Sequence, residues 1–217
     1  MPYPISEQLL RRNRSYQPLS PIGYVIHSTA NKNDSAQKER DYFNTNNLNA
    51  SVHYFVGATT IIRCVPENEV AWGCGSTGNH KFLQLEMCEG EDFTQVWLRT
   101  VSLVAEACVL RRWATGPNVY SHRGISAMYK ETDHQDPIAY LQSNGKTWEQ
   151  LLSAIDTEIA NIKKGPVIDP PVTSTPILDP DVNLVVWVAK SKVAEAIKSI
   201  NSLGFYAEQF PLKLRRD

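Results

Sequence analysis

Short runs rich in β-branched residues alternate with amphipathic helical segments along the first 162 residues, and this alternation leaves few possible architectures. The patterns predict strands over residues 22–28, 51–57, 60–65, 82–88 and 119–122, and helices over residues 34–44, 93–108 and 147–162. The tip formed by residues 57–59 predicts a hairpin between the second and third strands. Strands interleaved with helices, together with a hairpin, predict an α/β domain with a mixed central β-sheet flanked by helices.

The amino-acid composition of the chain changes after this domain. Residues 165–180 read GPVIDPPVTSTPILDP, and five prolines in sixteen residues predict a semi-rigid extended linker. Residues 181–217 follow with a small β-α-β pattern, too short to bury a stable core alone. The predicted organisation is therefore a domain over 1–164, the linker, and this module. The module either docks on the first domain or pairs with a second chain; we favour pairing, because such a linker holds modules apart.

Composition narrows the classes of partner. The chain is 42% hydrophobic and 21% charged with a net charge of -1, which fits a globular protein and argues against nucleic acid as a partner. No run approaches about 18 apolar residues, so no membrane insertion is expected. Residues 1–16 lack the apolar core of a secretory signal, so we expect synthesis in the cytoplasm. The cysteines form no C-x-x-C pair, and we expect reduced thiols at Cys64, Cys74, Cys88 and Cys108.

Three polar residues stand where ligands of a metal would stand. His27 and His122 end two predicted strands, and Asp136 follows His122 at a distance of fourteen residues. Two imidazoles and a carboxylate are a common ligand set of catalytic zinc, with the fourth position left to water. The alternative is that each histidine is a structural residue at a strand end, which spacing alone does not exclude.

A fourth polar residue lies on a strand that alternates. In FLQLEMC, Leu83, Leu85 and Met87 share one face, while Glu86 points to the other together with Gln84 and Cys88. A carboxylate on a strand between apolar neighbours is a candidate acid or base. The alternative is a solvated strand carboxylate.

Five runs of sequence point to one known family. They are, in order, VIHSTA, SVHYFVG, TIIRCVPENEVAWGCG, LQLEMC and SHRGISAMYKETDHQDP. Together, over residues 20–162, they resemble the N-acetylmuramoyl-L-alanine amidase family of phage endolysins, bacterial autolysins and peptidoglycan recognition proteins. The resemblance implies a zinc hydrolase that cuts the amide bond between N-acetylmuramic acid and L-alanine in bacterial peptidoglycan.

The resemblance also implies roles for single residues. The zinc (Zn2+) ligands would be His27, His122 and Asp136, and Glu86 would be the general base and proton donor. His134 stands where many members have a lysine that stabilises the oxyanion. This replacement matters, because histidine titrates near neutral pH and lysine does not. A second reading makes His134 a ligand.

Two further positions match the wall of the family's cleft. His53 and Trp72 would bind substrate there, or else belong to the scaffold: His53 as a hydrogen-bonded core residue and Trp72 as the anchor of a loop. Cys88 lies on the same strand face as Glu86, and Cys74 lies in the loop of Trp72. One alternative is that either thiol approaches the metal, but we expect both to be buried, inert thiols.

Three functions remain open at this level. Recognition proteins of the superfamily bind peptidoglycan but have lost a zinc ligand, whereas this chain keeps all three positions. Recycling amidases act on small muropeptides and do not usually carry a linker and a second module. That architecture favours a phage or prophage endolysin, released to the wall by a separate membrane-hole protein, over a bacterial autolysin. We assign the small module to wall attachment or to forming a homo-oligomer.

Overall fold

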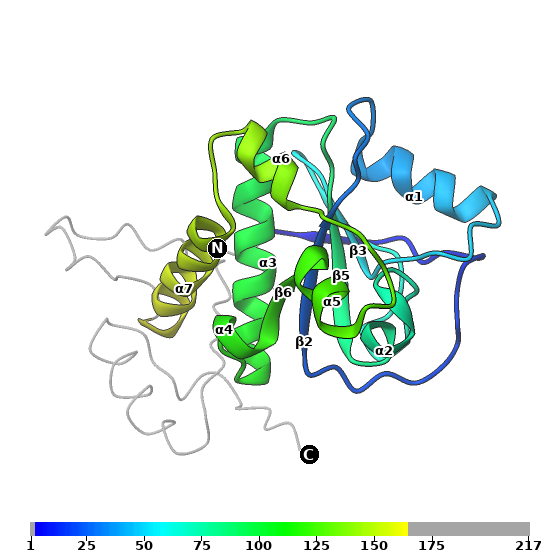
Figure 1. Ribbon diagram of the computed structural model, residues 1–217. Helices are drawn as coiled ribbons and strands as arrows, with labels where there is room; N and C mark the ends of the chain where they lie inside the picture. Colours follow the sequence, from blue (N-terminus) through cyan, green and yellow to red (C-terminus); the bar gives the residue numbers. More distant parts are fainter. Residues whose placement is uncertain (1–2, 165–217) are drawn as a thin grey trace, which may run out of the picture. The chain divides into compact units, whose positions relative to one another are not determined.

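The computed structural model describes residues 3–164, which form one six-stranded sheet with helices on both faces (Figure 1). The strand order is β1-β4-β3-β5-β2-β6. The strands are β1 (Ile5–Glu7), β2 (Gly23–Ser28), β3 (Tyr54–Val56), β4 (Ile61–Arg63), β5 (Phe82–Met87) and β6 (Val119–Ser121). The helices are α1 (Ala36–Thr45), α2 (Gly75–Asn79), α3 (Phe93–Arg111), α4 (Thr115–Asn118), α5 (His122–Tyr129), α6 (Ile138–Ser143) and α7 (Trp148–Lys164).

The sheet is mixed, as the sequence predicts. β2 runs parallel to both β5 and β6, and β3 runs parallel to β5. β4 is antiparallel to β3, and the predicted hairpin closes where the Gly57 N–H donates to the Thr60 carbonyl oxygen at 2.9 Å. The α/β class with helices flanking a mixed sheet is thereby confirmed for the described residues.

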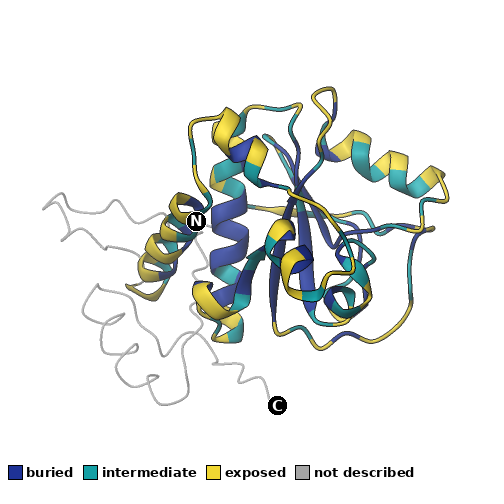
Figure 2. Cartoon of the chain, in the orientation of Figure 1, coloured by how far each residue is buried: buried dark blue, intermediate teal, exposed yellow. Residues whose placement is uncertain are grey.

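Two helical layers cover the sheet. Tyr24 and Ile26 of β2 pack into a core with α3 and α7, whereas Val25 packs on the opposite face against Ile125 of α5. α1 covers that same opposite face further along, where Phe43 packs against a cluster around Phe55. Figure 2 shows the strands buried between the layers and the outer side of α7 exposed. The alternation predicted for β5 holds, so its polar residues face α1, α2 and α5.

Side-chain caps place the ends of the helices. The Ser35 hydroxyl accepts from Lys38 N–H at the start of α1, and the Asp92 carboxylate accepts from Gln95 N–H at the start of α3. The predicted capping box of α7 is present: Thr147 N–H donates to the Gln150 side chain at 2.9 Å, and Gln150 N–H returns a bond to the Thr147 hydroxyl at 3.2 Å.

The prediction was wrong about the segment around His122. We expected this histidine to end a strand, but β6 stops at Ser121 and His122 is the first residue of α5. The Ser121 hydroxyl accepts from Gly124 N–H at 3.0 Å and starts the helix there. The helix begins on the residue directly after the strand, so no turn or loop residue marks the boundary between them.

The longest described helix, α3, is long and apolar enough to be compared with a membrane span. Among the described helices, α3 has the length and composition of a membrane span, with a mean hydropathy of 1.2 over the window. It lies between the sheet and α7, and nine of its residues are buried there. Its apolar character is therefore that of a core helix. Our expectation from composition overlooked this candidate.

The structure tests the prediction for the cysteines but not the predictions for residues 165–217. The four cysteines are all free and buried, as expected of reduced thiols. The linker over residues 165–180 and the module over residues 181–217 lie outside the described residues, so both stay predictions.

A close backbone approach at the start of β2 gives a test of this packing. A Cβ on Gly23 would lie 2.4 Å from the Asn118 carbonyl oxygen, whereas a Cβ on Gly116 meets nothing within 4 Å. We expect Gly23→Ala to lower the free energy of unfolding by about 1–3 kcal/mol, because backbone has to shift. Gly116→Ala, the matched control, should change it by less than about 0.5 kcal/mol. Equal denaturation midpoints for the two variants would contradict the strand packing.

Candidate metal centre

Three ligand-type side chains converge at one edge of the sheet. His27 is the penultimate residue of β2, His122 directly follows β6, and Asp136 lies in the loop that leads to α6. β2 and β6 are parallel neighbours, so their carboxyl ends share an edge. Ligand sites of open α/β sheets lie at this edge. The fold therefore brings together residues that are 109 positions apart from first to last.

The distances within this group fit one ion. The two Nδ1 atoms of His27 and His122 lie 2.9 Å apart. The Asp136 carboxylate places one oxygen 3.3 Å from His27 Nδ1 and the other 3.2 Å from His122 Nδ1. Tetrahedral ligands about 2.0–2.2 Å from a zinc ion are about 3.3–3.6 Å from one another. Among the described residues this is the one group of three histidine, cysteine or acidic side chains whose ligand atoms all lie within 4.8 Å of one another.

Burial and hydrogen bonds shift the pKa values of His27 and Asp136. Both imidazoles are 2% exposed, and burial lowers the pKa of His27, which favours the neutral ring that binds metals. Burial works against the charge of Asp136, but hydrogen bonds with His122 and His27 hold the pKa of this carboxyl below its ordinary value. A neutral His27 and an ionised Asp136 are the states in which these side chains bind a metal.

Backbone bonds fix the loop that carries Asp136. Ser28 N–H, at the end of β2, donates to Asp136 Oδ2 at 3.4 Å. Arg123 N–H, in the first turn of α5, donates to the Asp136 carbonyl oxygen at 3.1 Å. The third ligand is thereby tied to the elements that carry the other two.

Glu86 lies beside the ligands. It pairs in register with His27 on the neighbouring strand, and both point to the same face. The side chain is partly exposed, but its Oε2 atom is buried and has no hydrogen-bond partner among the described residues. Burial, and after it the negative charge of Asp136, raises the pKa of Glu86 well above its usual range. The solvated-carboxylate alternative does not fit this environment, because one carboxylate oxygen is buried without a partner among the described residues.

His134 borders the ligand group on its open side. Its side chain is 59% exposed, and its Nδ1 lies 3.4 Å from an oxygen of Asp136. The ring stacks on His122 with 4.3 Å between centroids. His134 is outside the group whose ligand atoms converge, so its position favours a role towards bound molecules over the ligand reading.

For His53 the structure corrects the substrate-contact prediction. The side chain is fully buried, its Nδ1 accepts from Gln84 N–H at 3.0 Å, and its Nε2–H donates to the Glu69 carbonyl oxygen at 2.9 Å. Both ring nitrogens are used inside the chain. His53 is therefore the hydrogen-bonded core residue of the alternative.

Trp72 and the cysteines take scaffold positions. Trp72 is half-buried and packs against the core cluster that includes α3, which matches the loop-anchor alternative; its contact with substrate stays a prediction. Cys74 and Cys88 are buried, and burial raises the pKa of both thiols. Neither thiol belongs to the ligand group.

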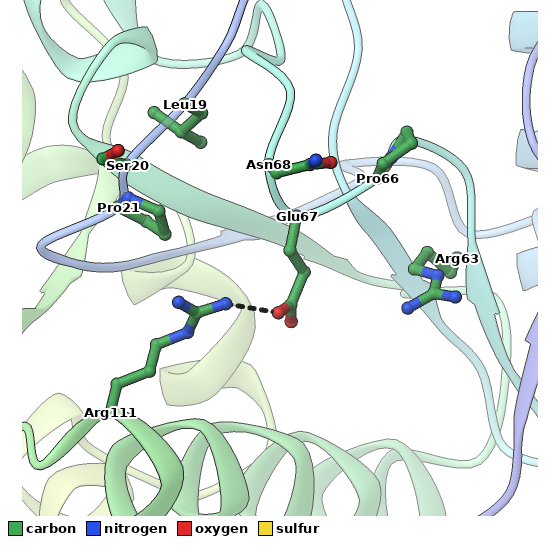
Figure 3. A pocket seen from close by; sticks show the side chains of 8 residues that line it. All are labelled: Leu19, Ser20, Pro21, Arg63, Pro66, Glu67, Asn68 and Arg111. Carbon is green, nitrogen blue, oxygen red and sulfur yellow. Dashed lines mark hydrogen bonds and ion pairs between the residues drawn. The ribbon is translucent and has the colours of Figure 1, made fainter. Parts of the chain in front are cut away.

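A hollow of about 630 Å³ lies elsewhere on the molecule (Figure 3). Arg111, at the end of α3, closes one side through its ion pair with Glu67. Residues 19–21 form another wall and lead into β2, so the hollow is at the amino end of that strand. It lies at the edge opposite the metal site and contributes nothing to it.

The fold and the site define a class, that of α/β proteins with a candidate His-His-Asp metal site beside a partly buried acid. Residues 17–139 match the model of the N-acetylmuramoyl-L-alanine amidase family. This match covers more than half of the chain, and the chain belongs to that family.

Relatives in sequence are autolysins. The bifunctional autolysin of Staphylococcus aureus strain MSSA476 is 31% identical over 201 residues, covering 86% of this chain and 16% of the relative. The bifunctional autolysin of strain N315 is 32% identical over 158 residues, covering 68% of this chain and 12% of the relative. The chain thus spans less than a fifth of the length of these curated relatives.

Solved structures share the fold. The Staphylococcus aureus hydrolase AmiA, in complex with its ligand, superposes with a TM-score of 0.68 at 26% identity, covering 76% of this chain and 87% of that one. A mutant endolysin from Bacillus subtilis gives a TM-score of 0.61 at 21% identity, covering 70% of this chain and 99% of that one. At 21% identity, the likeness to the endolysin shows the fold alone.

The buried position of His53 leads to a prediction about acid stability. Burial lowers the pKa of His53 to about 4, so between the unfolded value of about 6.5 and pH 4 only the unfolded chain takes up this proton. The free energy of unfolding should therefore decrease as the pH is lowered across that window. This group should contribute a loss on the order of 3 kcal/mol, since one pKa unit is about 1.4 kcal/mol. NMR titration of the ring checks it. A His53 pKa near 6.5 would contradict the burial.

Proposed function

We propose that this chain is a zinc-dependent amidase that hydrolyses the bond between N-acetylmuramic acid and L-alanine in bacterial peptidoglycan. The observation that carries the proposal is the convergence of His27, His122 and Asp136 beside Glu86. Membership of the amidase family supports the choice of bond.

The ligand chemistry supports zinc. Two imidazole nitrogens and one carboxylate oxygen at tetrahedral spacing suit Zn2+, while Mg2+ and Ca2+ prefer oxygen ligands alone. When bound at three such ligands, zinc acts as a Lewis acid and makes hydroxide available near neutral pH.

The chain's own residues would then move protons and balance charge. Glu86 takes a proton from the attacking water and returns it to the alanine nitrogen as the carbon–nitrogen bond breaks. Its raised pKa suits both steps, because a carboxylate of higher pKa is a stronger base towards the water and then holds the proton until the amine leaves. His134, at the exposed side, donates a hydrogen bond to the oxygen on which charge develops.

The setting of the activity has two candidates. An endolysin of phage or prophage is supported by the proline-rich segment followed by a small module, and it would act on the wall after release. An autolysin is supported by the curated relatives, which are bifunctional autolysins. The non-catalytic recognition protein is less well supported, because all three ligand positions are filled and meet in space.

Mass spectrometry of digested walls tests the proposal. Purified peptidoglycan treated with the full chain should release stem peptides with a free amino-terminal L-alanine and leave the glycan strands intact. Asp136→Ala, which removes one of the ligands, should lose metal and release nothing. New reducing sugar ends, or cut cross-links without free L-alanine termini, would overturn the proposed bond.

The acid–base role is tested by a matched pair of variants. Glu86→Gln should keep metal and fold but lower kcat/KM by about 10²–10⁴, because an amide cannot carry the proton. Glu39→Gln removes a neighbouring half-buried acid on α1 that does not reach the ligand group, and it should stay near wild type. Equal turnover of Glu86→Gln and wild type would remove Glu86 from the mechanism.

A further inference from the structure

The two histidine ligands differ at their outer nitrogens. His122 Nε2 lies 3.3 Å from the Thr132 hydroxyl, and that hydroxyl lies 2.6 Å from the hydroxyl of Ser126. His27 Nε2 is buried and has no partner among the described residues. A hydrogen bond therefore holds the outer nitrogen of His122, whereas packing alone surrounds the outer nitrogen of His27.

The order of the protons in this chain of contacts follows from the ligand role. When His122 Nδ1 binds a metal, the neutral ring carries its proton on Nε2. Nε2–H then donates to Thr132 Oγ1, and the threonine hydroxyl donates onward to Ser126 Oγ. A hydroxyl can accept and donate at once, which a methyl group in its place cannot do.

We propose that Thr132 is a positioning residue of the metal site: its hydroxyl selects the tautomer of His122 whose Nδ1 lone pair faces the metal and holds the ring in that orientation. The proposal rests on the metal site of the proposed function. It adds a residue that touches neither metal nor substrate and acts through His122 alone.

The segment around Thr132 is built to keep the hydroxyl in place. The neighbouring Glu131 carboxylate accepts from Thr77 N–H at 2.7 Å and from the Thr77 hydroxyl at 2.6 Å, which ties the segment to the start of α2. Four residues later the same segment delivers Asp136 to the ligand group. One stretch of chain thus supplies one ligand and orients another.

Metal affinity tests the proposal without any need for catalysis. Zinc affinity of the full chain is measured by competition with a chromophoric chelator for wild type, Thr132→Val and Thr132→Ser. Valine keeps the shape but not the hydroxyl, and we expect it to weaken affinity about 10–100-fold, the usual effect of losing such an outer partner. Serine restores the hydroxyl and should stay within about threefold of wild type.

The contact at the outer nitrogen is read separately in the zinc-loaded protein. Nitrogen-15 NMR of the imidazoles should show the His122 Nε2–H proton protected from exchange with water in wild type and exchanging faster in Thr132→Val. Ser126→Ala leaves Thr132 in place but removes its onward acceptor, and it should weaken zinc affinity by about 2–10-fold. If Thr132→Val unfolds, a Ser126→Ala affinity equal to that of wild type would overturn the positioning role.

The outcomes separate this proposal from the proposed function. Thr132→Val with affinity within about twofold of wild type, or a His122 Nε2–H proton that exchanges equally fast in the two zinc-loaded proteins, would overturn the positioning role. A wild-type chain that binds zinc with this pattern of variants but cuts no wall amide would overturn the amidase and leave Thr132 standing. A wild-type chain that binds no zinc would overturn both.

Discussion

The parallel pairing of β2 with β5 on one side and β6 on the other is the constraint on which the site depends. This pairing sets His27 against Glu86 in register and ends β2 and β6 at the same edge, where His122 follows at once. A slip of one residue in β5 would turn Glu86 into the α3 core. The apolar contacts of Tyr24, Ile26 and Leu85 on the other face resist that slip, so the packing of the core fixes the geometry of the site.

The polar face of the sheet carries buried polar atoms that have no hydrogen-bond partner among the described residues. His53 is buried there with both ring nitrogens paired, and Gln84 Nε2 donates to the Ala71 carbonyl oxygen, although Gln84 Oε1 has no partner among the described residues. Closer to the edge, Glu86 Oε2 and His27 Nε2 are also buried without partners among the described residues. Unsatisfied polar atoms beside a ligand group are expected at a functional site and are unfavourable elsewhere.

The sequence predicted what depends on local pattern and strong caps. β2, β5, α1, α3 and α7 follow from periodicity and capping residues, and the ligand set followed from the resemblance. β1, α2, α4 and α6 are three to six residues long, too short for periodicity to reveal. The role of His53 was wrong because its partners, a backbone N–H and a backbone carbonyl oxygen, come from segments that only the fold brings together. Thr132 was missed for the same reason, since no local pattern marks a hydroxyl that meets a histidine ten residues earlier.

The central claim is that two imidazoles and one carboxylate hold a single zinc ion at the edge of the sheet. X-ray absorption at the zinc edge of the purified, zinc-loaded chain tests it most directly, because the first shell reports the identity of the ligand atoms. The account predicts one zinc per chain, with nitrogen and oxygen neighbours only, at about 2.0–2.2 Å. A sulfur neighbour at about 2.3 Å would show that a cysteine has taken the place of Asp136 and would contradict the account.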